Sequence, residues 1–198
     1  TYTFTPSGPT VDGSGLVTLA AGATYTFTET NAAGCISPAS ADVVIVAQPA
    51  TPSAPVAGTI TQPTCTEATG SFTIVNFDAT STYTFTPSGP TVDGSGVVTL
   101  AAGATYTFTE TNAAGCESAA SSNVVVDAQP ATPSAPTAGA ITQPTCAVAT
   151  GSFTIASFDA TSTYTFTPSG PTVDGSGVVT LAAGATYTFT ETNAAGCI

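Results

Sequence analysis

The residues best suited to chemistry in this sequence are its five cysteines, Cys35, Cys65, Cys116, Cys146 and Cys197. Cys35, Cys116 and Cys197 are spaced by 81 residues, and the same interval separates Cys65 from Cys146. Cysteines that recur in pairs with a small module are typical of disulfides formed in an oxidising compartment. The alternatives are buried free thiols or a zinc site, but two thiolates per module without histidine are too few zinc ligands.

We expect each pair to bridge within one module, so that Cys65 bonds Cys116 and Cys146 bonds Cys197. Cys35 would then pair with a residue that precedes the sequence. A bond from Cys35 to Cys65 would have to cross a stiff linker, whereas Cys65 and Cys116 fall within one module. Cys65 can, however, be placed nearer the turn after the first strand than the turn that holds Cys116. A disulfide closing a loop of about 50 residues could add ~4 kcal/mol.

Carboxylates are the second group that could do chemistry, because the chain has 12 acidic residues and no lysine, arginine or histidine. In the alternation of its predicted strand, Glu110 falls on the side that faces the core, and the chain contains no cation with which it could pair. We expect Asp78 to lie at the same pole, where a calcium ion could neutralise both side chains. The equivalent pair is Asp159 and Glu191. The alternative is that these carboxylates are solvated at strand ends.

A calcium loop is a weaker interpretation of Thr91–Gly96, because this segment lacks the further acidic residues that such loops use. Asp93-Gly94 is more simply a hairpin turn. Apart from calcium we expect no cofactor.

The charge balance excludes several classes of function. Without a cationic side chain the chain cannot neutralise nucleic-acid phosphates or bind anionic lipid headgroups electrostatically. Histidine-based catalysis and lysine nucleophiles are likewise excluded, and the serines and acids have no base to join them. No apolar run approaches the roughly 20 residues of a membrane span. We therefore expect no enzyme activity, no nucleic-acid partner and no membrane insertion.

These residues sit in a repeated stretch. Residues 82–116 recur at 163–197 without change and at 1–35 with one change, Leu16. Within the stretch, Thr82–Thr86 and Thr105–Thr109 alternate threonine with aromatic residues, the period-two pattern of half-buried strands. Prolines and glycines between them force turns. A fixed 81-residue period indicates one small module in an array.

The segment between Leu100 and Tyr106 resembles the tyrosine corner of immunoglobulin-like and fibronectin type III domains. There the tyrosine begins a strand and its hydroxyl bonds back to the preceding corner, while Gly103 would supply the permissive backbone. Gly184 and Tyr187 are the equivalents in the third copy.

The repeat predicts five segments. Residues 1–46 are the C-terminal part of a first module, 56–127 are a complete second module, and 137–198 are a third module lacking its last strand. Two linkers, 47–55 and 128–136, have prolines every third residue, as in polyproline II, and are semi-rigid spacers.

We expect the second module to be a two-sheet sandwich of six or seven short strands. The predicted strands are 58–62, 70–77, 81–86, 96–101, 104–111 and 123–127, with a further short strand near 91–93. The predicted core consists of Phe72, Ile74, Tyr83, Phe85, Val98, Leu100, Tyr106, Phe108 and two of the valines 124–126.

Threonine rows such as Thr105, Thr107 and Thr109 could match an ice lattice or carry O-glycans. More simply, they reflect β propensity on an outer face. No Asn-x-Ser/Thr sequon is present.

Four short motifs together resemble the Ig-like repeats of very large secreted proteins of Bacteroidota, especially flavobacteria. These motifs are Gln-Pro-Thr-Cys at 62–65, Leu-Ala-Ala-Gly at 100–103, Asn-Ala-Ala-Gly-Cys at 112–116 and Ala-Gln-Pro-Ala-Thr-Pro at 128–133. SprB-type gliding-motility adhesins and related cargo of the type IX secretion system are the nearest named examples. The resemblance implies export and display on the bacterial cell surface. The chain departs from antibody-type domains in having no tryptophan and in having no cysteine in the middle of the predicted second and sixth strands. The usual disulfide between those two strands therefore cannot be carried over.

The sequence therefore predicts an all-β chain of tandem Ig-like or fibronectin III-like sandwiches. As function we expect the extended shaft of a cell-surface adhesin or filament. The alternatives are a glycan- or cell-binding adhesive module and a non-catalytic spacer of a secreted enzyme. The expected partners are neighbouring repeats, other chains of a filament, and surface or glycan ligands.

Overall fold

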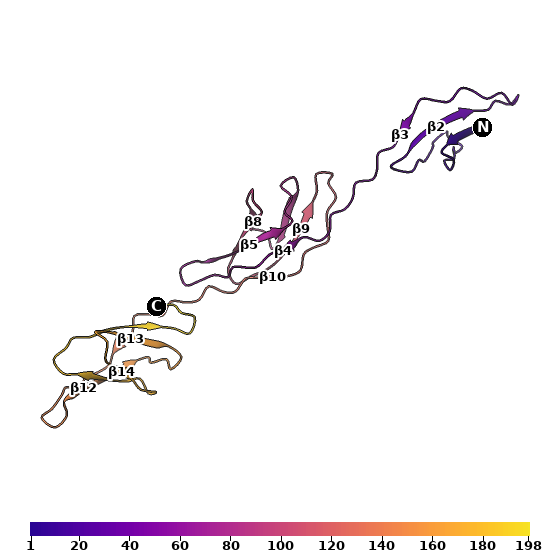
Figure 1. Cartoon of the computed structure of the whole chain (residues 1–198). Coiled ribbons are helices and arrows are strands. Elements are labelled where there is room, and N and C mark those ends of the chain that lie inside the picture. Colours follow the sequence, from indigo (N-terminus) through magenta and orange to yellow (C-terminus); the bar gives the residue numbers. More distant parts are fainter. The chain divides into compact units, whose positions relative to one another are not determined.

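The computed structural model describes residues 1–198 and contains strands and turns but no helix (Figure 1). The second module has seven strands that form two antiparallel sheets, ordered β4-β5-β8-β7 and β10-β9-β6. Four strands facing three is the arrangement of constant-type immunoglobulin sandwiches, so the expected fold class is confirmed. The strands are β4 (Val56–Ala57), β5 (Thr69–Val75), β6 (Thr82–Thr86), β7 (Thr91–Val92), β8 (Val97–Ala101), β9 (Thr105–Thr111) and β10 (Val124–Val125).

The first strand of this module differs from the prediction of 58–62. It begins earlier, with Ala57 opposite Ile74, and the pairing resumes only at an isolated bridge between Thr61 and Ser71. The register shifts by one residue between these two points, which is the signature of a β-bulge. The residues 58–62 do run beside β5, but the bulge interrupts their ladder.

The core of the second module follows the alternation of the sequence. Of the predicted residues only Tyr83 is half-buried rather than buried; it stacks on Phe77 with ring centroids 5.5 Å apart. Phe85 and Phe108, from β6 and β9, stack at 5.0 Å. The buried residues are Phe72, Ile74, Phe85, Val98, Leu100, Tyr106, Phe108, Val124 and Val126.

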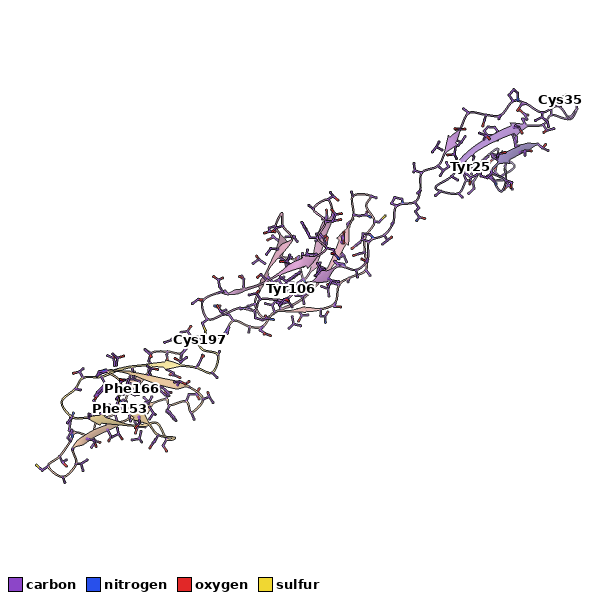
Figure 2. The ribbon with its side chains drawn as sticks, in the orientation of Figure 1. Tyr25, Cys35, Tyr106, Phe153, Phe166 and Cys197 are labelled. Atoms are coloured by element: carbon purple, nitrogen blue, oxygen red, sulfur yellow. A yellow bond between two sulfur atoms is a disulfide. The ribbon has the colours of Figure 1, made fainter.

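The third module repeats this plan with one strand fewer. Its sheets are ordered β11-β12-β15-β14 and β13-β16. Phe153 and Phe166 come from opposite sheets and lie in the core between them (Figure 2). The strands are β11 (Thr137–Ala138), β12 (Thr150–Ala156), β13 (Thr163–Thr167), β14 (Thr172–Val173), β15 (Val178–Ala182) and β16 (Thr188–Thr192).

The first module forms one sheet, ordered β1 (Tyr2–Thr5), β2 (Thr24–Glu29) and β3 (Val43–Val44). Phe4 and Tyr25 are its buried residues.

The chain packs as two compact units. One consists of Thr1–Pro52 together with Asn112–Glu117, and the other of Ser53–Thr111 with Ser118–Ile198. The loop 112–117 thus groups with residues that precede the second module. No helix in the structure is long and apolar enough to cross a membrane.

Candidate functional site

One disulfide joins two modules. Cys65, in the loop before β5, is bonded to Cys197, in the loop after β16, with a Cα–Cα distance of 5.5 Å and a sequence separation of 132 residues. Cys197 is buried, with 1% of its surface exposed. The remaining cysteines, Cys35, Cys116 and Cys146, are free thiols.

The predicted bonds Cys65–Cys116 and Cys146–Cys197 are therefore wrong, and the reason lies in the strand order. Thr69, at the start of β5, pairs with Ala101 at the end of β8, so Cys65 lies at the pole where β9 begins. Cys116 follows the other end of β9. A seven-residue strand spans roughly 23 Å, whereas a disulfide needs Cα atoms about 4.4–6.8 Å apart. Neither sandwich contains a disulfide between two of its own cysteines.

Side-chain amides hold the linker beside this disulfide. The Gln129 amide donates to the backbone oxygens of Thr64 at 3.2 Å and Cys65 at 3.3 Å. From the third module, the Asn193 amide donates to the Ala131 oxygen at 2.7 Å. The linker thus bonds to the Cys65 loop on one side and the Cys197 loop on the other. We call the disulfide with these contacts the joint.

Gln62 fixes the end of the second module next to the joint. Its amide nitrogen donates to the Val125 oxygen at 3.1 Å, and its amide oxygen accepts from the Asp127 N–H at 2.9 Å. One side chain thereby replaces two ladder hydrogen bonds just before the linker starts. The Gln-Pro-Thr-Cys motif therefore positions both the last strand and the bonded cysteine.

The Ser81 hydroxyl bridges the carboxylates of Asp78 and Glu110. Ser81 Oγ lies 2.8 Å from Glu110 Oε1 and 3.4 Å from Asp78 Oδ2. Hydrogen bonds from the Thr80 backbone N–H, then from the Thr80 and Ser81 hydroxyls, lower the pKa of Asp78. Glu110 thus has a neutral hydrogen-bond partner where the sequence offered no cation.

The third module repeats this cluster, with Ser162 Oγ 2.8 Å from Glu191 Oε1. Hydrogen bonds from Thr161, backbone before side chain, and from Ser162 lower the pKa of Asp159. No group of three or more aspartate, glutamate, cysteine or histidine side chains gathers in the structure. Calcium at these pairs stays a prediction.

The segment Thr91–Gly96 comprises β7 and the turn that joins it to β8. Asp93 Oδ1 accepts from the Ser95 N–H, the Ser95 hydroxyl and the Val97 N–H at 2.8–2.9 Å. That oxygen is occupied by the turn itself, as expected for a hairpin. Gly96 has φ +82°, and a Cβ there would lie 2.5 Å from the Phe77 ring.

The residues predicted for a tyrosine corner lie around the turns before β9 and β16, and the corner hydrogen bonds of Tyr106 and Tyr187 stay a prediction. Tyr106 is buried at the start of β9, and Tyr187 is half-buried beside β16. In the first module the Ala20 N–H donates to the hydroxyl of the equivalent Tyr25 at 3.3 Å. Gly103 has φ +76° and donates to the Val126 oxygen at 3.1 Å. Gly184 has φ +78°.

Two serines that the sequence reasoning missed complete β9. Ser121 Oγ accepts from the Phe108 N–H at 3.0 Å and Ser118 Oγ accepts from the Glu110 N–H at 2.9 Å. These hydroxyl groups accept hydrogen bonds from backbone N–H groups of β9 that the two-residue β10 is too short to pair. The signal was present, since Ser37 and Ser40 recur at the 81-residue interval and bond Glu29 and Phe27 in the same way.

Comparison with known proteins identifies no family: no family model matches the sequence, and no curated protein matches it. Among solved structures, it is similar to the N-terminal eight Ig domains of Down syndrome cell adhesion molecule isoform 1.30.30. That match has 11% identity, a TM-score of 0.38, and covers 97% of this chain and 34% of the other. The chain thus spans about a third of that structure's length.

It is also similar to the FN1–FN3 domains of chicken CNTN1, at 12% identity and a TM-score of 0.29. This match covers 96% of the chain and 75% of the other. The sandwich fold of the second and third modules is established by their own strand order and register.

Proposed function

We propose that the chain is part of the extended shaft of a bacterial cell-surface adhesin or filament. The observation that supports this role best is the joint, in which the Cys65–Cys197 bond ties one sandwich covalently to the next. A shaft must transmit force from module to module. Because the linker 128–136 already joins the two sandwiches, the disulfide adds a second covalent connection that limits how far a pull can separate them. The linker contacts from Gln129 and Asn193 restrict the same joint.

The surface chemistry agrees with an extended array. The net charge is −12 with no lysine or arginine, so modules repel one another at low ionic strength. The outward residues of β6 are all threonine, the exposed Thr82, Thr84 and Thr86. Such faces give modules little apolar surface on which to fold back.

A disulfide between modules favours an oxidising, extracellular location. This location and the motif resemblance together support a more specific proposal, in which the chain is exported by type IX secretion and acts in gliding motility. Immunolabelling of intact cells of the source organism with antibodies to the array tests that location. Label that appears only after the cells are opened would overturn it.

Small-angle X-ray scattering of arrays with two, four and six repeats tests the shaft itself. Strand and linker lengths give an axial increment of about 35–60 Å per repeat, and we expect the maximum dimension to grow linearly with repeat number. A radius of gyration that rises only as a weak power of chain length, as in a compact globule, would contradict the proposal. Specific retention on a glycan array would instead favour the adhesive-module alternative.

A further inference from the structure

The loops that carry Cys116 and Cys197 have the same local structure. Both contain Asn-Ala-Ala-Gly-Cys. Asn112 Oδ1 accepts from the Ala114 and Cys116 N–H groups at 3.1 and 3.0 Å. Asn193 Oδ1 accepts from the equivalent N–H groups at the same distances. The two cysteines are thus held by the same turn.

Both loops also bond to the linker in front of their module. The Asn112 amide donates to the Ala50 oxygen at 2.8 Å, which matches the 2.7 Å bond from Asn193 to Ala131. Cys116 Sγ lies 3.9 Å from the Pro49 oxygen. Asn112–Glu117 accordingly belongs to the same compact unit as Thr1–Pro52. The bond that ties the Cys197 loop to its linker is therefore also present in the Cys116 loop.

The two cysteines differ in what lies opposite them. Cys197 is bonded to Cys65, whereas Cys116 is a half-buried free thiol. A partner at the same register would precede Cys116 by 132 residues, a position before Thr1. The Cys116 loop therefore makes the same hydrogen bond to its linker as the Cys197 loop makes in the joint, but Cys116 has no cysteine partner.

We propose that Cys116 is a cross-linking position for the Gln-Pro-Thr-Cys loop of a preceding module of this repeat. In that loop, Thr64 and Glu67 bond each other, with the Thr64 N–H donating to the Glu67 oxygen at 2.9 Å and the Glu67 N–H donating to Thr64 Oγ1 at 3.1 Å. Gln48, the equivalent of Gln129 in the first linker, would donate to the backbone oxygens of the incoming loop. By the same register, Cys146, the equivalent of Cys65, forms a disulfide with the cysteine of a following module that is equivalent to Cys197.

The cross-link forms by thiol–disulfide exchange with a small-molecule disulfide such as oxidised glutathione. One cysteine thiolate attacks the glutathione disulfide and releases one glutathione thiolate. The second cysteine thiolate attacks the resulting mixed disulfide and releases the other. One S–S bond forms and one breaks, the two electrons reduce glutathione, and the cysteine protons pass to solvent or glutathione.

A prefixed chain tests the register directly. Residues 56–81 are copied and fused before Thr1, which completes the first module and places a copied Cys65 at the same 132-residue separation from Cys116. After refolding in a glutathione buffer, we expect non-reducing peptide mapping with a glutamyl endopeptidase or pepsin to find the copied cysteine bonded to Cys116. Cys35 and Cys146 remain alkylatable. In the matched control, where the copy carries Cys65→Ser, Cys116 stays alkylatable as well.

A bond from the copied cysteine to Cys35 would restore the pairing within one module and overturn the proposal. An unbonded copy in a folded prefix, with strand protection measured by hydrogen exchange, would overturn it too. If the prefix does not fold, residues 117–197 copied after Cys197, with Cys146→Ser in the copy so that its peptides can be distinguished, provide the second test, in which Cys146 must bond the copied Cys197. Failure of this register leaves the shaft proposal standing, because scattering measures extension independently of which cysteines pair.

Discussion

The second and third modules contain the same 35-residue stretch, 82–116 and 163–197, yet bury it differently. Phe108 has 1% of its surface exposed, whereas its equivalent Phe189 is half-buried. Leu100 and Leu181 differ in the same way. Identical residues thus lie in two environments, and local sequence cannot account for the difference.

The difference comes from β10 and the residue after it. Val124 pairs with Tyr106, and Val124 and Val126 are both 2% exposed in the core. In the third module, whose second sheet contains only β13 and β16, a groove of about 300 Å³ lies over Leu181, Tyr187 and Phe189. The last strand therefore closes the sandwich over these residues, and it also lengthens its neighbour, since β9 begins at Thr105 whereas β16 begins only at Thr188.

The pairing register, by contrast, is the same in both modules. Tyr83 lies opposite Glu110, and Tyr164 lies opposite Glu191. Alternation of threonine with aromatic residues specifies this pairing, because a slip of one residue would turn every aromatic ring outward. The pairing of these two strands is local, whereas burial and the first two residues of β9, which pair with β10, depend on a strand further along the chain.

The largest expected effect is at Phe108. Phe108→Ala removes a fully buried ring that contacts Phe72 and Phe85, and should cost about 3–5 kcal/mol. Amide hydrogen exchange followed by NMR reports each module separately, and the amides of β6 and β9 should lose protection while those of β13 and β16 keep theirs.

The matched variant Phe189→Ala should cost the third module clearly less, roughly half as much, because part of that ring already contacts solvent. Equal losses of protection in the two modules would show that the half-burial of Phe189 has no energetic consequence, and would break the comparison.

Val126→Ala tests the closing strand itself. The side chain is buried, and Val126 Cγ1 packs so near Gly70 that a Cβ there would approach it to 2.8 Å. Removing two methyl groups should cost about 2 kcal/mol and make exchange in the second module resemble that in the third. Val125→Ala, at a position that is 50% exposed, is the control and should have little effect.

Much of this fold could be predicted, and the failures share a physical cause. The alternation in Thr82–Thr86 identifies both the strand and its core residues, and Asp93-Gly94 marks its turn, because these features depend on neighbours in sequence. The partner of Cys65 depends on which pole of the sandwich its loop reaches and on the next module. A cysteine spacing constant across the repeat fits bonds within or between modules equally well.

The serines after β9 were missed for a related reason. Their recurrence at the 81-residue interval does not by itself reveal a hydrogen bond. Their role appears only because β10 stops at Val125 and leaves the Phe108 N–H without a strand partner. The bulge at 58–61 belongs to the same class, because one extra residue in a short edge strand leaves the alternation around it almost unchanged.

Ser121→Ala should have a moderate effect. It leaves the Phe108 N–H without its acceptor in a buried position, which should cost about 1–2 kcal/mol. The equivalent change in the first module, Ser40→Ala, affects a more exposed hydrogen bond to Phe27 and should cost less. Amide exchange at Phe108 and Phe27, followed by NMR, measures both. A slower exchange at Phe108 in the variant would contradict the role given to Ser121.

The smallest expected effect concerns the pH dependence of the β7–β8 turn. Hydrogen bonds from the Ser95 hydroxyl, and then from the Val97 and Ser95 N–H groups, lower the pKa of Asp93 below its ordinary value of 3.8. A carboxylate whose pKa is lowered by folding contributes stability above the unfolded value, and this contribution is lost as pH falls through the folded pKa.

Asp93→Asn should therefore reduce the loss of stability of the second module between about pH 4.5 and pH 2, as followed by hydrogen exchange in that module. The first module provides the comparison, because the Ser14 hydroxyl and the Leu16 and Ser14 N–H groups likewise lower the pKa of Asp12. There the flanking strands are reduced to one bridge, between Val11 and Val17. If the turn is locally encoded, Asp12→Asn should shift the acid response of its own turn in the same direction. A shift at Asp93 alone would show that the turn depends on the completed sheet around it.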